Sequence, residues 1–226
     1  MPRIYKLSRT GLKILYKIRH HKGHGIHSPF VFSLITKVIE EKTPYHIYED
    51  INILIDPYKS LRLKKYNRLS LRMVNYFNAL RILEIGSGYG VNTLCLTAPS
   101  SSTICTCIET EKKKYSLAEK LYKNWNRNIT LHTDRQLPVL KEKQDCIFID
   151  LNNFNYLSLD ICKYLSDMSH EKTFIIVKGI RTNRRNQMLW RSIINIESRT
   201  AVLDMFNIGI LFFDKTLYRW NYQISF

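Results

Sequence analysis

Three glycines that alternate with other residues carry the clearest chemical signal in this sequence. Gly86, Gly88 and Gly90 follow an apolar run and the acid Glu84, within the string ILEIGSGYG of residues 82–90. Because glycine has no Cβ, such a turn can adopt left-handed dihedral angles and lets a flat ligand lie directly against the backbone. The pattern therefore predicts a strand that leads into a nucleotide-type cofactor loop.

The spacing of the glycines narrows the class of cofactor. A dinucleotide loop reads G-x-G-x-x-G and holds a pyrophosphate at the next helix N-terminus, whereas this loop reads G-x-G-x-G. A carboxylate at Glu84 would repel a pyrophosphate but would suit a ligand with an ammonium group, such as S-adenosylmethionine. The alternative is a strand, turn and helix whose glycines serve packing alone.

A second acid lies where a ribose would need it. Residues 103–108 form a β-rich run that ends at Glu109, 19 residues beyond Gly90. In Rossmann-like units an acid at about this distance binds the ribose hydroxyls, and a carboxylate can accept from both at once. Capping of the helix expected at 112–125 is an alternative role, and the two roles are compatible.

With these residues the chain resembles the class I S-adenosylmethionine-dependent methyltransferases, whose first motif is an apolar strand, an acid and G-x-G-x-G. The resemblance implies that S-adenosylmethionine is the cofactor. The residues expected to bind it lie in the glycine loop and at the ends of the next two strands. They are Glu84, Gly86, Ser87, Gly88, Tyr89, Gly90, Glu109 and Asp134.

The remaining sequence predicts the elements that position this loop. Apolar strands alternate with helical stretches, which indicates a parallel sheet buried on both faces. The strands are expected at 82–85, 103–108, 129–133, 146–149, 173–177, 200–206 and 209–213, and the helices at 91–98, 112–125, 155–167 and 184–196. The last two strands leave no room for a helix between them, so we expect them to pair antiparallel at one edge.

The fold class expected is therefore α/β: a Rossmann-like, doubly wound, mostly parallel seven-stranded sheet with a C-terminal antiparallel hairpin. We expect a basic helical extension or cap at 1–78 and the cofactor-binding domain at 79–226. Ligands of such sheets bind beyond the carboxyl ends of the strands, where the acids Glu84, Glu109, Asp134 and Asp150 fall.

Composition limits the class of protein further. The hydrophobic content of 45% excludes a disordered chain. No apolar run approaches the length of a membrane span, and the N-terminus lacks the apolar core of a secretory signal. The five cysteines are an odd number without CxxC spacing, so we expect reduced thiols and a cytoplasmic protein.

The net charge of +16 is concentrated ahead of the expected cofactor domain. Residues 1–42 hold nine Lys or Arg and two acids, a net charge of +7, and the basic residues of 3–19 recur at helical intervals. A basic amphipathic helix can bind RNA, lie on an anionic membrane surface or form the solvated flank of a cap. The sequence leaves these three interpretations open, together with the oligomeric state.

The string HGIHSPF follows this basic segment. Its histidines belong to a group of four within residues 20–27, but no Cys, Asp or Glu nearby completes a metal site. Ser28-Pro29 is typical of a helix N-cap followed by proline, which predicts a helix through Glu41. The string resembles the opening of a group of bacterial class I methyltransferase-like proteins, many from Bacteroidetes, in which a short helical extension precedes the cofactor domain.

The departures from this family concern catalysis. In related metal-dependent O-methyltransferases the fourth strand ends in Asp-Gly-Asn-His or similar and the fifth in paired acids or Asp-Asn. This chain has DLNN at 150–153 and VKGI at 177–180, and a lysine in place of a carboxylate would repel magnesium. We therefore expect no metal. Asp150 is the candidate base, with Lys178 a second candidate if it is desolvated and a solvated strand-end residue otherwise.

Two functions fit these residues. The first is a metal-independent methyltransferase that acts on the oxygen or nitrogen of an unknown acceptor, a small molecule or RNA. The second is a catalytically degenerate member of the fold that binds a cofactor, nucleic acid or a protein partner. Basic and aromatic residues at 64–68 and between Arg181 and Trp190 could contact RNA, although DLNN lacks the proline and aromatic residues of base-methylating motifs.

Overall fold

The structure, a computed structural model, describes residue 11 and residues 27–153 and 161–226. The predicted basic helix and most of the histidine string lie outside the described residues. The first part of the helix predicted at 155–167 also lies outside them.

Strand β1 (Arg81–Ile85) shows why this chain forms a central sheet. Ile82 packs into one hydrophobic core, whereas Leu83 and Ile85 pack into another on the opposite face. Successive side chains of a strand face opposite sides, so a continuous apolar run requires cover on both. The parallel neighbours of β1 are β2 (Ile104–Ile108) and β4 (Gln144–Asp150).

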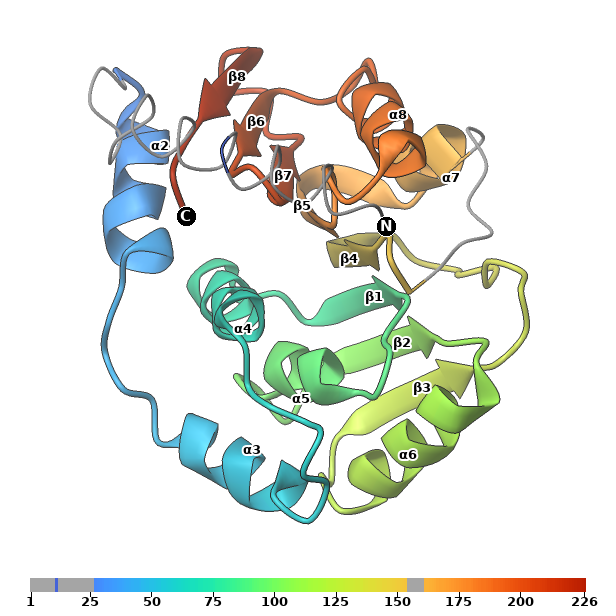
Figure 1. The fold of residues 1–226 in the computed structure, drawn as a ribbon. Coiled ribbons are helices and arrows are strands. Elements are labelled where there is room, and N and C mark those ends of the chain that lie inside the picture. The colour runs from blue at the N-terminus through green and yellow to red at the C-terminus, as the bar shows by residue number, and fades with distance from the viewer. Residues whose placement is uncertain (1–10, 12–26, 154–160) are drawn as a thin grey trace.

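Eight strands form a single sheet in the order β3-β2-β1-β4-β5-β7-β6-β8 (Figure 1). The remaining bounds are β3 (Asn128–His132), β5 (Ser169–Lys178), β6 (Ala201–Asp204), β7 (Ile208–Phe212) and β8 (Trp220–Gln223). Strand β7 runs antiparallel between β5 and β6, which confirms the C-terminal hairpin. The sheet has one strand more than the seven predicted. Strand β8 pairs with β6 as a mostly exposed four-residue edge, so it carries no apolar alternation that sequence could reveal.

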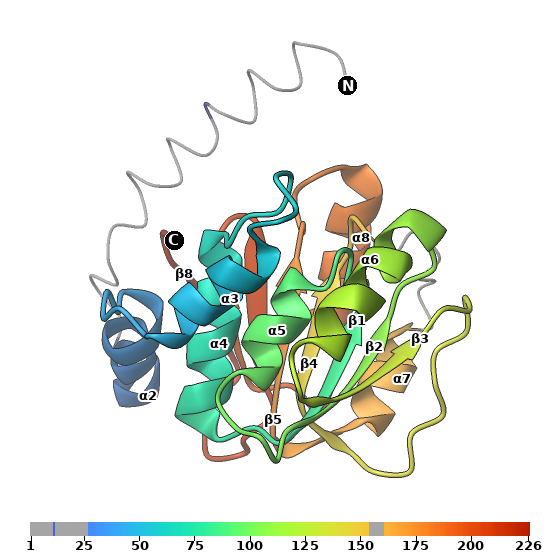
Figure 2. The ribbon, with the colours of Figure 1, turned by 90° about the horizontal axis from the view of Figure 1, so that it is seen from below.

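Helices cover both faces of the sheet (Figures 1 and 2). The helices on one face are α2 (Pro29–Leu34) with its π-helical continuation η1 (Ile35–Ile39), α3 (Ile47–Ile55), α4 (Lys65–Phe77), α5 (Val91–Thr97) and α6 (Lys112–Lys123). The other face is covered by α7 (Ile161–Asp167) and α8 (Arg184–Ile193). The alternation of strands and helices thus produces the predicted doubly wound architecture.

The N-terminal helices share a core with the sheet. Ser28 caps α2 as predicted, and its Oγ accepts a hydrogen bond from Val31 N at 3.4 Å. The side chains of Val31 and Leu34 are fully buried in the same core as Ile82. Asn78, the last residue of the extension expected from the sequence, is the left-handed C-cap of α4, and β1 begins three residues later at Arg81.

Two composition-based predictions can be compared with the described residues. None of their helices is both long and apolar enough to cross a membrane. All five cysteines are free, and four of them are buried. Burial raises the pKa of the Cys105 and Cys146 thiols well above the usual value, because a buried thiolate lacks solvation.

Candidate active site

The glycine loop turns from the end of β1 into α5. The φ angles of Gly86, Gly88 and Gly90 are 84°, 62° and 86°, a region that side chains other than glycine rarely adopt. A Cβ at residue 90 would lie 2.8 Å from the Tyr122 ring, so this glycine is required by helix packing. A Cβ at residue 88 would lie 2.8 Å from Asn153 Nδ2, so the glycine allows the Asn153 side chain, which follows β4, to lie close to the loop backbone.

Glu109 connects the glycine loop to the end of β2. Its side chain is fully buried, and Oε2 accepts a hydrogen bond from Gly88 N at 2.8 Å. Oε1 accepts from the backbone N–H groups of Thr110 and Glu111 at 2.9 and 3.0 Å. A carboxylate offers about four acceptor positions, so these three bonds leave one on Oε2 for a further donor.

Glu84 lies behind the loop rather than on its open side. The side chain is fully buried, Oε1 accepts from Asn92 Nδ2 at 2.8 Å, and Oε2 accepts from the Thr93 hydroxyl. Burial raises the pKa of Glu84 to about 7, with the two hydrogen bonds opposing the shift. The carboxylate therefore fastens the first turn of α5 to β1.

Two further loop residues differ in exposure. Ser87 is buried, and its Oγ has no hydrogen-bond partner among the described residues. Tyr89 is half-buried. A buried hydroxyl without a partner is costly, so the loop has a polar position that a bound molecule could satisfy.

The two candidate catalytic residues form an ion pair at the ends of adjacent strands. Lys178 Nζ contacts Asp150 Oδ2, and the Asp150 carboxylate also accepts from Asn152 N at 3.0 Å. The Lys178 side chain is 18% exposed and its ammonium lies 4.4 Å from the ring centroid of Tyr66. Lys178 is therefore a paired, mostly buried cation, which corrects the alternative of a solvated strand-end residue.

Sequence reasoning missed two residues of this constellation. Asn153 Nδ2 donates to Asp150 Oδ2 at 2.9 Å and to Gly86 O at 3.3 Å, so its amide joins the glycine loop to the ion pair. Tyr66 projects from α4 and lies under the Lys178 ammonium. The DLNN string was a signal for Asn153, whereas the contact of Tyr66 depends on packing between distant segments.

The remaining predicted contacts lie apart from this cluster. Asp134 is exposed in the loop after β3, where its Oδ1 accepts from Gln136 N at 3.0 Å. Trp190 is only 5% exposed and packs against Gly209. The predicted stacking of Trp190 on RNA bases is therefore wrong. Arg181 forms an ion pair with Asp204 at 2.6 Å. The described residues contain no group of three or more His, Cys, Asp or Glu that could hold a metal ion.

Comparison with known proteins identifies the fold. No family model matches the chain, and a search of curated proteins finds no match. Among solved structures, an O-methyltransferase from Bacillus cereus in complex with SAH is 19% identical, with a TM-score of 0.53, and the match covers 81% of this chain and 97% of that one.

Two further structures give the same result. A putative O-methyltransferase from Klebsiella pneumoniae is 17% identical with a TM-score of 0.57, over 82% of this chain and 96% of that one. TomG from Streptomyces achromogenes, an O-methyltransferase of tomaymycin synthesis in complex with SAM, is 14% identical with a TM-score of 0.53, over 85% and 98%. The chain therefore has the Rossmann-like α/β fold of these methyltransferases.

Proposed function

We propose that this protein is an S-adenosylmethionine-dependent methyltransferase that acts, without a metal, on an oxygen or nitrogen acceptor. The main observation behind the proposal is the buried Glu109 carboxylate, which accepts a hydrogen bond from Gly88 N. It lies at the strand ends of a fold that solved structures of SAH- and SAM-bound enzymes share. Free thiols support a reducing compartment, for which we propose the cytoplasm.

The residues of the loop fit this cofactor. The open acceptor position on Glu109 Oε2 suits a ribose hydroxyl, and the left-handed turn at Gly88 directs its N–H to the same carboxylate oxygen. The unpartnered Ser87 hydroxyl suits a polar group of the ligand. Asp134 and Tyr89 are proposed to border the adenine, and Glu84 to hold the loop from behind.

The chain would then have to place a nucleophile in line with the transferable methyl group. S-adenosylmethionine supplies that group as an activated sulfonium methyl. Positioning provides most of the acceleration in such a transfer, and a base is required only when the acceptor must lose a proton. Asp150 Oδ2 is the proposed proton acceptor. It would become available when a polar group of the methyl acceptor binds the Lys178 ammonium in its place.

The ion pair also supports independence from metal ions. Magnesium requires several oxygen ligands, and the ammonium of Lys178 already neutralises the one carboxylate at the end of β4. A divalent cation at this position would meet electrostatic repulsion from Lys178. We therefore expect methyl transfer to persist in the presence of a chelator.

The alternative function is a degenerate methyltransferase fold that binds its cofactor or a partner without turnover. One observation favours it: Lys178, Asn152 N and Asn153 Nδ2 all occupy the Asp150 carboxylate. A carboxylate with these three donors is a poor proton acceptor unless a substrate displaces one of them. The two functions differ in whether the methyl group of S-adenosylmethionine is transferred to another molecule.

Transfer of label tests the proposed function. Purified protein is incubated with methyl-labelled S-adenosylmethionine, a chelator and a total cell extract, and label is then measured in RNA, protein and small molecules. We expect label in one fraction, and Asp150→Asn should reduce its rate at least about tenfold. Asp167→Asn, which removes the same charge from an exposed position on α7, should transfer as the wild type does.

One outcome would decide against the enzyme, and another would decide only against its proposed base. Saturable cofactor binding without label in any fraction supports the degenerate binding module. Equal rates in Asp150→Asn and the wild type would remove Asp150 from the mechanism.

A further inference from the structure

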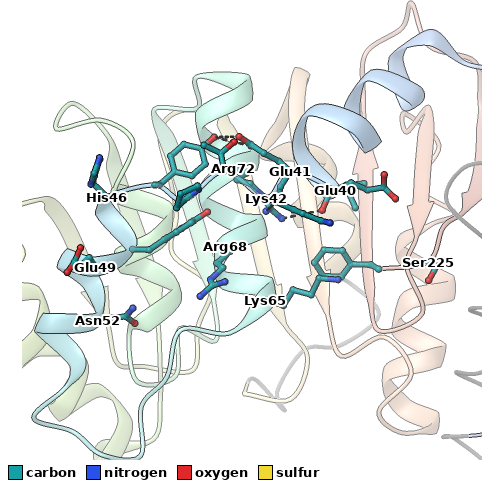
Figure 3. Close-up of a pocket in the computed structure, with 16 residues that line it drawn as sticks. Glu40, Glu41, Lys42, His46, Glu49, Asn52, Lys65, Arg68, Arg72 and Ser225 are labelled. Carbon is teal, nitrogen blue, oxygen red and sulfur yellow. Dashed lines mark hydrogen bonds between the residues drawn. The ribbon is translucent and has the colours of Figure 1, made fainter.

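A large cleft lies on the helical cap, outside the glycine loop. It has a volume of about 1260 Å³ and lies between α4, α3, the segment after η1 and the C-terminal residues (Figure 3). None of the glycine-loop residues, Asp150 or Lys178 lines it. Small-molecule sites are usually concave and combine apolar walls with a few converging polar groups. This cleft is lined by both aromatic and charged side chains.

Two donors near the cleft lack acceptors, one on α4 and one on α3. Arg72 is 7% exposed, and its terminal nitrogens donate to backbone oxygens of Ile39 and Glu41, but its Nε–H has no partner among the described residues. The buried hydroxyl of Tyr48 also has none. Leaving buried donors unpaired is unfavourable, so an acceptor from outside the chain would stabilise both walls.

A third donor group lies beside these two. The Arg68 guanidinium lies 5.4 Å from the ring centroid of Tyr48 and forms no hydrogen bond or ion pair with the described residues. The positive charges of Arg72 and Arg68 both oppose the increase in the Tyr48 pKa, which burial raises to about 12. Arg68 and Arg72 are four residues apart on α4, so they project from the same face of that helix. A guanidinium presents several N–H groups in a fork that matches carboxylate and phosphate oxygens.

The other walls of the cleft give it a mixed character. Aromatic rings of Tyr45 and Phe226 provide flat apolar surface, and the Lys65 ammonium lies 3.9 Å from the Phe226 ring centroid. The charged residues that line the cleft are Lys42, Lys65, Arg68, Arg72, Glu40, Glu41 and Glu49, together with His46. Glu41 already accepts from the Tyr45 hydroxyl at 3.0 Å. Acids from the segment after η1 and from α3 thus line the same cleft as the basic groups of α4 (Figure 3).

We propose that this cleft is a second binding site, for a small aromatic molecule that carries a carboxylate or phosphate. The anionic oxygens bind Arg68, the Tyr48 hydroxyl and Arg72 Nε–H, and the ring lies against Tyr45 and Phe226. The proposal is independent of the methyltransferase function, because it uses none of the residues at the glycine loop.

Titration of the full-length protein with phenyl phosphate and with benzoate tests the site. Calorimetry and the chemical shifts of the backbone amides detect the binding. Phenol, which lacks the anionic group, is the neutral probe. We expect saturable binding of at least one anion, amide shifts in residues 40–49 and 65–72, and much weaker binding of phenol. The tighter of the two anions identifies the oxyanion that the site prefers.

Variants locate the anion. Arg68→Gln should weaken binding at least about tenfold, because a charge-assisted hydrogen bond is lost. Arg62→Gln removes the same charge from an exposed position outside the cleft and should bind as the wild type does. Tyr48→Phe removes only an unpartnered hydroxyl, so it should weaken binding without lowering stability. These variants test the site even if Arg72 variants fail to fold.

Three results would overturn the proposal. The first is the absence of saturable binding for both anions at millimolar concentration. The second is equal weakening in Arg62→Gln and Arg68→Gln, which would indicate non-specific attraction to a basic protein. The third is a set of amide shifts confined to residues 86–90.

Discussion

Glu84 shows how one acid of the cofactor motif can serve the fold. The sequence predicted a contact with the ammonium group of a ligand, but both carboxylate oxygens are occupied by side chains of α5. Asn92 continues this network, because its Oδ1 accepts from Asn67 Nδ2 of α4 at 3.1 Å. The acid therefore holds the loop, β1 and two helices in fixed relation.

The pKa of Glu84 makes a pH-dependent prediction. Its folded-state value of about 7 lies above the ordinary value of 4.5, so the folded protein holds this proton more tightly than the unfolded chain. Stability is then lost as pH rises from about 4.5 to about 7. Glu84→Gln, which cannot ionise, should gain stability relative to the wild type by up to roughly 3 kcal/mol over this range.

Urea denaturation at pH 5 and pH 8 measures this difference. The free energy of unfolding of Glu84→Gln minus that of the wild type should be larger at pH 8. Glu119→Gln, at an exposed position on α6, serves as control and should show no such change. A difference that is the same at both pH values would contradict a raised pKa at Glu84.

At the scale of elements, the packing of α8 on the sheet depends on a glycine in β7. A Cβ at residue 209 would lie 2.0 Å from the Trp190 ring, which is buried against that strand. Gly209→Ala should therefore destabilise the protein by roughly 1–3 kcal/mol through overpacking. In a Trp190→Leu background the same substitution should have a much smaller effect, because the smaller side chain leaves room.

Thermal or urea denaturation of the four proteins in this cycle measures the coupling between the two positions. Gly209 has no left-handed backbone conformation, so its requirement is steric. An equal loss of stability in both backgrounds would contradict the close contact of Trp190 with β7.

The elements that the sequence predicted well are those with strong local patterns. Continuous apolar strands, the Ser28-Pro29 cap and the glycine loop are visible in short windows, and each lies where expected. Strand β8 could not be predicted, because a four-residue exposed edge has no periodicity to detect.

The site was predicted to a lesser extent, for a physical reason. The acids at strand ends follow from topology, so Glu109 and Asp150 were placed correctly at the carboxyl edge of the sheet. The Lys178 ion pair, the Asn153 bridge and the ring of Tyr66 depend on side-chain packing between segments far apart in the chain. The DLNN string pointed to Asn153, but spacing along the sequence does not specify which distant side chains make these contacts.

At the scale of the whole molecule, the net charge of +16 favours an anionic partner. We propose RNA or an anionic surface, with the basic residues of 3–19 in the N-terminal extension as the main contact. For RNA, the logarithm of affinity should fall linearly with the logarithm of salt concentration. Replacement of six basic residues by Gln should reduce that slope by up to about 4. These residues are Arg3, Lys6, Arg9, Lys13, Lys17 and Arg19.

Filter binding with single-stranded RNA over a range of salt concentrations measures this slope. The matched control replaces six exposed lysines of the cofactor domain: Lys112, Lys113, Lys120, Lys123, Lys141 and Lys143. An unchanged slope in the N-terminal variant, or affinity independent of salt in the wild type, would argue against this partner surface.

Calorimetric titration with S-adenosylhomocysteine tests the central claim most directly. The glycine loop and Glu109 predict saturable one-site binding to the wild type. Glu109→Gln should weaken this binding at least about tenfold, because the variant loses a charged acceptor of hydrogen bonds. Glu119→Gln should bind as tightly as the wild type does. Absence of binding at millimolar ligand, or equal affinity in Glu109→Gln and the wild type, would contradict the cofactor site proposed for this loop.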